Sequence, residues 1–361
     1  MPPLQDRYLE VGGLRIRYWE AGIDGPNLVL IHGLGGAVEV WRRVLAPLAR
    51  HHRVVALDLP GCGRSQSPPA YPADTLGFFA ATVLGLMDAL GMTTARLIGS
   101  SLGGAVALEI AIRAPARAEC LILANSAGFS HDVAWPLRLM SVPGVGEVLT
   151  RPGREHAALA LRSCVADPAC ITEEDIDQAY ALAILPGAQA AFLGMLRVYC
   201  SVLGVQRATL HRLAHNIPAI TAPVLVVWGD CDAIIPIQSA ARAVALLPRS
   251  ALAVFHGAGH LIFVEEPARF VDLAEQFLVD PDAVLAAYRQ TPLDGHRRTL
   301  WGAHLLERVG PALTPQRVAV GIAGLALLAA APRVVRRMSS LGGQQGTSNL
   351  PGWDRTPPRN R

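Results

Sequence analysis

The sequence contains no lysine, and all 32 of its basic residues are arginines. Acidic residues number 29, so the formal net charge of the 361-residue chain is only +3. Proteins that bind nucleic acids carry a larger excess of positive charge, gathered on one face. The composition therefore indicates no nucleic-acid partner, and we attribute the exclusive use of arginine to genome composition rather than to phosphate recognition.

Recognisable disulfide and metal patterns are absent as well. The six cysteines form no Cys-x-x-Cys pair and do not combine with histidines at ligand spacing. This pattern predicts free thiols in a reducing compartment, although Cys164 and Cys170 are close enough in sequence to be bridged in an exported protein. Residues 1–6 lack the apolar core of a secretory signal. We therefore expect a cytoplasmic protein without a metal site.

A dinucleotide site is not indicated either. Gly33 and Gly35 lack the spacing of the phosphate-binding fingerprint, and the acidic residue that normally follows it is missing. We expect no cofactor.

Short apolar runs alternate with helical segments over the first third of the chain. Runs this apolar, with helices between them, predict parallel strands that are buried on both faces. An opening hairpin is predicted around a Gly-Gly turn at 12–13, and residues 76–90 have helical spacing. The predicted strands lie at 8–11, 14–20, 28–31, 54–57, 95–98 and 120–123, and later at 224–229 and 251–255.

Residues 99–103 read Gly-Ser-Ser-Leu-Gly, a G-x-S-x-G motif between a predicted strand and a predicted helix. A strand that turns sharply into a helix holds the central serine in a strained backbone conformation, and small neighbours let the chain pass close by. The helix amino terminus favours the negative charge that develops during attack. Ser101 is therefore the candidate nucleophile.

Three further polar segments follow predicted strands. Residues 32–36 (His-Gly-Leu-Gly-Gly) follow the strand at 28–31, and residues 230–232 (Asp-Cys-Asp) follow the strand at 224–229. Residues 257–260 (Gly-Ala-Gly-His) follow the strand at 251–255. An acid and then a histidine after the serine is the order of catalytic residues in the α/β-hydrolase family.

The chain resembles that family over about residues 8–280. Further matching segments are Asp58 to Ser65, the aromatic Trp41 and the pair Glu266-Pro267, which opens the last helix. The resemblance implies an α/β-hydrolase fold with a mostly parallel central sheet flanked by helices, an inserted helical cap and a C-terminal extension. The implied division is a first core part at 1–127, the cap at 128–218, a second core part at 219–280 and the extension at 281–361.

The resemblance also implies the roles of the site residues. His260 is the expected base, and Asp232 is the expected acid, with Asp230 as its rival beyond the same strand. Backbone amides of Leu34 and Leu102 are expected to form the oxyanion hole. Relatives that take the acid from the end of the preceding strand do not match here, because residues 124–126 are Ala-Asn-Ser.

A serine nucleophile predicts acyl transfer to water, with a small carboxylic ester or thioester as substrate. Dehalogenases and epoxide hydrolases of this fold use aspartate instead. Meta-cleavage hydrolases, which cut C–C bonds, also use serine but usually carry tryptophan after the histidine, where this chain has Leu261. Cofactorless haloperoxidases and non-catalytic, ligand-binding members of the fold remain as alternatives.

The extension from residue 281 is basic, with eleven arginines against four acids. It contains an uncharged run at 318–332, which is shorter than the roughly 20 residues of a membrane span. Arginines flank this run on both sides. We expect the extension to be dispensable for catalysis and either to contact membranes peripherally or to pack on the hydrolase body.

Overall fold

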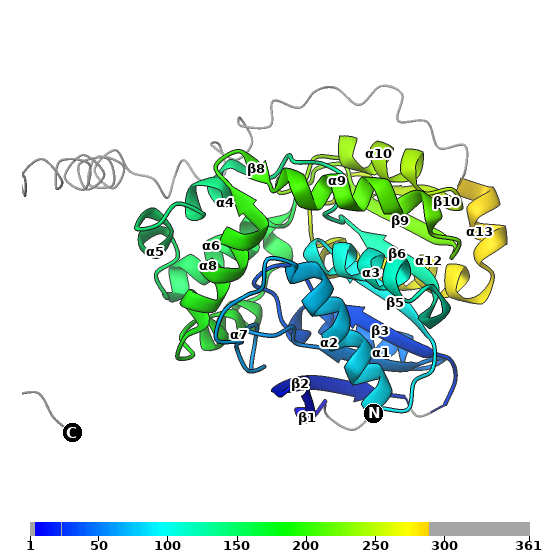
Figure 1. Cartoon of the computed structure of the whole chain (residues 1–361), viewed down its shortest axis with the longest axis horizontal. Helices are drawn as coiled ribbons and strands as arrows, with labels where there is room; N and C mark the ends of the chain where they lie inside the picture. Colours follow the sequence, from blue (N-terminus) through cyan, green and yellow to red (C-terminus); the bar gives the residue numbers. More distant parts are fainter. Residues whose placement is uncertain (1–3, 23, 289–361) are drawn as a thin grey trace, which may run out of the picture. The chain divides into compact units, whose positions relative to one another are not determined.

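The computed structural model describes residues 4–22 and 24–288, and in these residues eight strands form one sheet (Figure 1). The strand order is β1-β2-β4-β3-β5-β6-β9-β10. The strands are β1 (Arg7–Val11), β2 (Leu14–Ala21), β3 (Asn27–Ile31), β4 (Arg53–Leu57), β5 (Ala95–Ser100), β6 (Ala118–Ala124), β9 (Val224–Gly229) and β10 (Ser250–Phe255).

The sheet is parallel from β4 to β10, and β1 and β2 join it as an antiparallel hairpin. The turn of the hairpin has Gly12 and Gly13 at φ 57° and 78°, values that favour glycine. Because the strands from β3 onward run in the same direction, their carboxyl ends lie along one edge of the sheet. The polar segments that follow these strands are therefore gathered at that edge.

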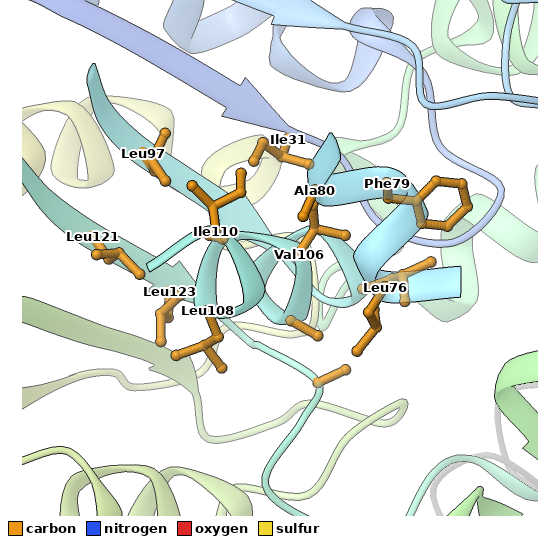
Figure 2. Close-up of a cluster of buried hydrophobic side chains, with 14 of the residues drawn as sticks. Ile31, Leu76, Phe79, Ala80, Leu97, Val106, Leu108, Ile110, Leu121 and Leu123 are labelled. Carbon is orange, nitrogen blue, oxygen red and sulfur yellow. The ribbon is translucent and has the colours of Figure 1, made fainter. Parts of the chain in front are cut away.

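Helices cover both faces of the sheet, and the strand side chains alternate between two cores. Val29 and Ile31 of β3 belong to the core beneath α2 and α3, whereas Leu28 and Leu30 belong to the core beneath α1 and α12. Figure 2 shows the first core, where α2 and α3 meet the strands. The helices of the body are α1 (Arg42–Leu48), α2 (Thr75–Ala89), α3 (Leu102–Arg113), α10 (Gln238–Leu246), α11 (Ile262–Glu265), α12 (Pro267–Val279) and α13 (Pro281–Tyr288).

A mainly helical insert separates β6 from β9, and Figure 1 shows α4 to α8 gathered beside the body that holds the sheet. Together, the sheet, its flanking helices and this insert confirm the predicted fold class. The predicted cap is helical, but it also contains β7 (Cys200–Ser201) and β8 (Gly204–Val205), which form a short hairpin. The helices are α4 (Trp135–Met140), α5 (Val145–Leu149), α6 (Arg154–Ser163), α7 (Glu173–Ala183), α8 (Ala188–Tyr199) and α9 (Arg207–Asn216).

Helix α13 lies beyond the predicted end of the hydrolase body at residue 280. Its Val284 and Leu285 are buried in the same core as α12 and β10, at 7% and 1% exposure. The packed body therefore continues to at least Tyr288. The basic extension after residue 288, with its apolar run at 318–332, lies outside the described residues.

The described residues were also searched for membrane-spanning helices. In this part of the chain no single helix has both the length and the apolarity to cross a membrane. Helices α7 and α8 satisfy length and composition only as a pair that is bent by 87°.

Candidate active site

Ser101 lies at the turn between β5 and α3, with φ 53° and ψ −120°. This is a sparsely populated conformation for a residue with a side chain, and it costs of order 1–3 kcal/mol. The turn is tight because glycines stand on both sides of it. A Cβ at Gly99 would overlap the carbonyl of Gly103, and a Cβ at Gly103 would overlap the carbonyl of Ile31. The G-x-S-x-G sequence thus has a steric basis here.

Neighbouring backbone holds this strained turn in place. The Ser101 N–H donates to the Ala124 carbonyl at 3.0 Å, and the Ser101 carbonyl accepts from the Ala127 N–H at 2.9 Å. The side chain is partly exposed. Among the hydrogen bonds of the described residues, none involves the Ser101 Oγ, so the serine and His260 are not bonded to each other in this structure. Such bonds are often long without substrate and tighten in the complex.

His260 lies in the loop after β10, where it is 5% exposed. Its Nδ1 is 2.8 Å from the Oδ2 of Asp232. A carboxylate can only accept, so the Nδ1 carries the proton and the Nε2 of a neutral ring is left as an acceptor. The imidazole is thereby oriented as a general base requires.

The Asp232 carboxylate is fully buried and accepts four hydrogen bonds. Its Oδ1 accepts from the backbone N–H groups of Ile234 at 2.7 Å and Ile235 at 3.0 Å. Its Oδ2 accepts from Asn125 Nδ2 at 2.7 Å and from His260 Nδ1. These donors compensate for the cost of burying a charge.

The rival acid, Asp230, points to a different histidine. Its carboxylate accepts from the Gly257 N–H at 2.7 Å and lies 2.9 Å from His256 Nδ1. Partial burial disfavours its charge, but these partners hold the pKa of Asp230 below its usual range. Of the two carboxylates that follow β9, the structure therefore places Asp232 against His260.

Asn125 is a polar site residue whose side-chain contact we did not predict from the sequence. It follows β6, is fully buried and adopts φ 47°. The sequence showed only that no carboxylate stands at this position. An asparagine that directly follows a buried strand, next to the strand of the nucleophile, was the available signal, but it does not reveal the bonding partner.

The loop after β3 approaches the serine closely. A Cβ at Gly33 would stand 2.9 Å from the Ser101 Cβ. Leu102 is the first residue of α3, so its N–H is one of the helix amides without an intrahelical acceptor. Leu34 follows Gly33 and is partly buried. The two predicted oxyanion donors thus belong to the two backbone segments that border the serine.

His32 braces this loop from beneath. It is fully buried, its Nε2 accepts from the Leu59 N–H at 3.0 Å, and its Nδ1 is 2.7 Å from the Gly33 carbonyl. Burial lowers the pKa of His32 to about 4. The ring is therefore neutral at pH 7, with the proton on Nδ1, and links the loop after β3 to the loop after β4.

The insert is bonded directly to the histidine loop. The Cys164 carbonyl accepts from the N–H groups of His260 at 2.8 Å and Leu261 at 3.0 Å. Glu265 strengthens this contact from α11, because its carboxylate accepts from the N–H of Gly259 at 2.6 Å and from that of Ala166 at 2.6 Å. Neither contact was predicted from the sequence, because the partners are about 100 residues apart.

The Cys164 thiol is subject to the negative charge of the Asp232 carboxylate. Burial, reinforced by that negative charge, raises the pKa of the thiol to about 12. The thiol is therefore protonated at pH 7 and is a poor nucleophile. Within the described part of the chain, no group of three or more His, Cys, Asp or Glu side chains is arranged to hold a metal ion.

These contacts define a serine at a strained turn, a buried Asp-His pair and two backbone amides on adjacent segments. The strand order places β5, β6, β9 and β10 side by side, so these groups lie along the same edge of the sheet. Such a set can activate a hydroxyl and stabilise an oxyanion, which is the chemistry of acyl transfer.

Comparisons with known proteins agree with this geometry. The sequence profile of a family described as "alpha/beta hydrolase fold" matches residues 26–163 and 187–267. A 2-hydroxymuconate semialdehyde hydrolase from Pseudomonas sp. (strain CF600) is 31% identical over 77% of this chain and 95% of its own length.

Two solved structures are also similar. A meta-cleavage product hydrolase from Pseudomonas fluorescens IP01 has a TM-score of 0.66 and 26% identity, with 76% of this chain and 98% of that chain covered. A bacterial membrane phospholipase A has a TM-score of 0.62 and 29% identity, with 78% and 86% covered.

Proposed function

The chain belongs to the α/β-hydrolase fold family and is a serine hydrolase, and on that basis we propose that it cleaves a carboxylic ester or thioester through an acyl-enzyme. The proposed triad is Ser101, Asp232 and His260. The observation that carries the proposal is the Asp232–His260 hydrogen bond at the strand edge where Ser101 occupies its strained turn.

In the proposed reaction, the Ser101 Oγ attacks the carbonyl carbon of the substrate and its proton passes to the Nε2 of His260. The carbonyl oxygen becomes an oxyanion, which accepts hydrogen bonds from the backbone N–H groups of Leu34 and Leu102. Asp232 stabilises the imidazolium through Nδ1 and does not itself take the proton. Collapse of the intermediate breaks the bond to the leaving group, which departs with the proton from His260.

Hydrolysis of the acyl-enzyme repeats these steps with water. The water oxygen attacks the acyl carbon as its proton passes to His260, and a second oxyanion forms. The bond to Ser101 then breaks, the serine regains a proton, and the carboxylic acid is released. Leaving-group identity does not alter this sequence, so esters and thioesters are both compatible with it.

Cleavage of a C–C bond is the second candidate, and the similarity to a 2-hydroxymuconate semialdehyde hydrolase favours it. Leu261 stands where meta-cleavage hydrolases usually carry tryptophan, and this difference supports the ester proposal.

A substrate panel separates the two candidates. We would assay the full-length protein with p-nitrophenyl esters of increasing chain length, with acyl thioesters, and with 2-hydroxymuconate semialdehyde followed by its loss of absorbance. We expect turnover of esters or thioesters that Ser101→Ala abolishes and Ser250→Ala retains, because Ser250 lies at the opposite end of its strand. Efficient cleavage of the semialdehyde with negligible ester turnover would overturn the proposal in favour of a C–C hydrolase.

A fluorophosphonate probe tests the non-enzymatic alternative. It phosphonylates only an activated serine, so it should label the wild-type chain at Ser101 and leave Ser101→Ala unlabelled. A folded wild-type protein that resists the probe would indicate a binding pocket rather than an enzyme.

A further inference from the structure

We propose that Asn125 is a positioning residue for the Asp232 carboxylate. The inference rests on the proposed function, because it concerns the acid of the proposed triad. It adds a fourth side chain, which acts through Asp232 and touches neither the substrate nor the reacting atoms. Three observations carry it: the backbone conformation of Asn125, the atoms that it contacts, and the orientation of its amide.

The backbone conformation of Asn125 is unusual in the same way as that of the serine. Among the described residues, Asn125 and Ser101 are the non-glycine residues with positive φ, at 47° and 53°. They follow paired positions, because Ser100 of β5 is in register with Ala124 of β6. Asparagine tolerates the left-handed conformation better than most residues. Backbone strain in a protein is commonly concentrated at functional sites.

The side chain of Asn125 donates from Nδ2 to the Oδ2 of Asp232 at 2.7 Å. This is the oxygen that also contacts His260 Nδ1 at 2.8 Å. The Asn125 N–H donates to the Val227 carbonyl of β9 at 2.9 Å, so the residue is tied to the strand that leads to Asp232. The Oδ2 of Asp232, which faces His260, is thus held by a donor that follows the neighbouring strand β6, in addition to the contacts within the loop after β9.

The amide can have only one orientation beside an ionised Asp232. In this orientation Nδ2 faces the carboxylate, and the Oδ1 of Asn125 is buried without a hydrogen-bond partner among the described residues. The reverse orientation would place the amide oxygen against the carboxylate oxygen, which is repulsive. A buried oxygen without a partner costs about 1–3 kcal/mol. Asn125 therefore donates a hydrogen bond to Asp232 while its own amide oxygen is left without a donor among the described residues.

The hydrogen bonds on both of its oxygens fix the orientation of the Asp232 carboxylate. Two backbone donors hold Oδ1, and Asn125 holds Oδ2 in the position that His260 requires. An aspartate at position 125 would have nearly the same shape but would face Asp232 with an acceptor. Two carboxylates at this distance share one proton instead of both ionising freely. The neutral amide therefore lets one acid, Asp232, carry the charge alone.

The experiment compares Asn125→Asp with Asn125→Gly in the full-length protein. The first preserves shape and reverses the hydrogen-bond polarity, and the second removes the donor while tolerating positive φ. The matched control is Asn27→Asp, because Asn27 also donates an amide, to the Thr94 carbonyl, but at the opposite end of its strand. We would measure kcat/KM for a p-nitrophenyl ester, and the rate of fluorophosphonate labelling, each as a function of pH.

We expect Asn125→Asp to lower both rates on the order of tenfold to a hundredfold at pH 7, because the acid is displaced. We also expect the midpoint of the acidic limb to fall, since a proton shared with the new carboxylate draws negative charge away from the Asp232 oxygen that faces His260 and stabilises the imidazolium less. Asn125→Gly should show the same loss of rate, and Asn27→Asp should show neither effect. Cys164 and Glu265, the other titratable groups near the pair, are unchanged in these variants, so a shift is attributable to position 125.

A purely structural role would lower thermal stability and leave the acidic limb where it is. If both Asn125 variants fold and keep the wild-type rates and pH profile, the positioning role is refuted. That result is distinct from failure of the proposed function, in which the wild-type serine itself would not react with the probe. If Asn125→Asp does not fold, the rates and profile of Asn125→Gly decide the question.

Discussion

Replacing each of the two carboxylates after β9 with its amide tests the assignment of the acid. Asp232→Asn keeps the shape of the side chain but replaces one acceptor oxygen with a donor. That amide would meet donors from both His260 and Asn125, or from the backbone of Ile234 and Ile235. In either orientation a donor faces a donor. The imidazole then either loses its partner or adopts the wrong tautomer, with Nε2 protonated and unable to act as a base.

The expected size of this effect follows from the same contacts. Loss of the correct tautomer in a triad lowers kcat by about three to four orders of magnitude, which corresponds to roughly 4–5.5 kcal/mol of transition-state stabilisation. Asp230→Asn should change kcat less than about threefold, because its partners are His256 and Gly257 rather than His260. The ratio of the two variants is therefore predicted to exceed about a hundredfold.

The assay is kcat and KM for one p-nitrophenyl ester, with thermal melts to establish that both variants fold. A larger loss in Asp230→Asn than in Asp232→Asn would transfer the role of the acid to Asp230. Small and equal losses would show that neither carboxylate supports the histidine, and the Asp232–His260 contact would then have no catalytic meaning.

Three further predictions concern the framework of the site. His32 is neutral in the fold, with a pKa of about 4 against an unfolded value of 6.5, so its contribution to stability is complete above pH 6.5 and is lost as the pH falls toward 4. Between these pH values the free energy of unfolding in urea should therefore fall by up to about 3 kcal/mol more for the wild type than for His32→Gln. Equal losses in the two proteins would contradict this. Gly103→Ala should cost about 3 kcal/mol or more, or prevent folding, because its Cβ overlaps the backbone of β3, and a wild-type melting temperature would refute that overlap. A chain ending at Tyr288 should melt higher than one ending at Asp280, because only the longer chain buries Leu285, and equal melting temperatures would show that α13 is dispensable.

The sheet could be predicted from the sequence because its strands are almost wholly apolar. Runs such as 28–31 and 224–229 are buried on both faces, and each is followed by the glycine or polar residues at which it ends. The nucleophile turn was also visible, since its glycines are required by close backbone contacts. These features leave a pattern within a few residues of the sequence, even where the contact that requires the glycine, as between Gly103 and the Ile31 carbonyl, joins distant segments.

The parts that could not be predicted depend on pairs distant in sequence. Asn125 meets Asp232 across 107 positions, and Glu265 meets the Ala166 N–H across 99. Neither pairing leaves a local pattern. Helix α13 was assigned to the extension because the family resemblance ends at about residue 280, although Leu285 of this helix packs in the core with α12 and β10. The choice between Asp230 and Asp232 likewise depends on the loop after β10, because this loop carries both His260 and the partners of Asp230.

Fluorophosphonate labelling of the full-length protein, followed by intact-mass and peptide mass spectrometry, tests most directly whether Ser101 is an activated nucleophile. We expect one phosphonyl group per chain on Ser101, formed at a rate that falls by orders of magnitude in His260→Ala and is unchanged in Ser250→Ala. Labelling at a different residue, or a rate at Ser101 that does not depend on His260, would contradict the claim that this serine is a nucleophile activated by the Asp232–His260 pair.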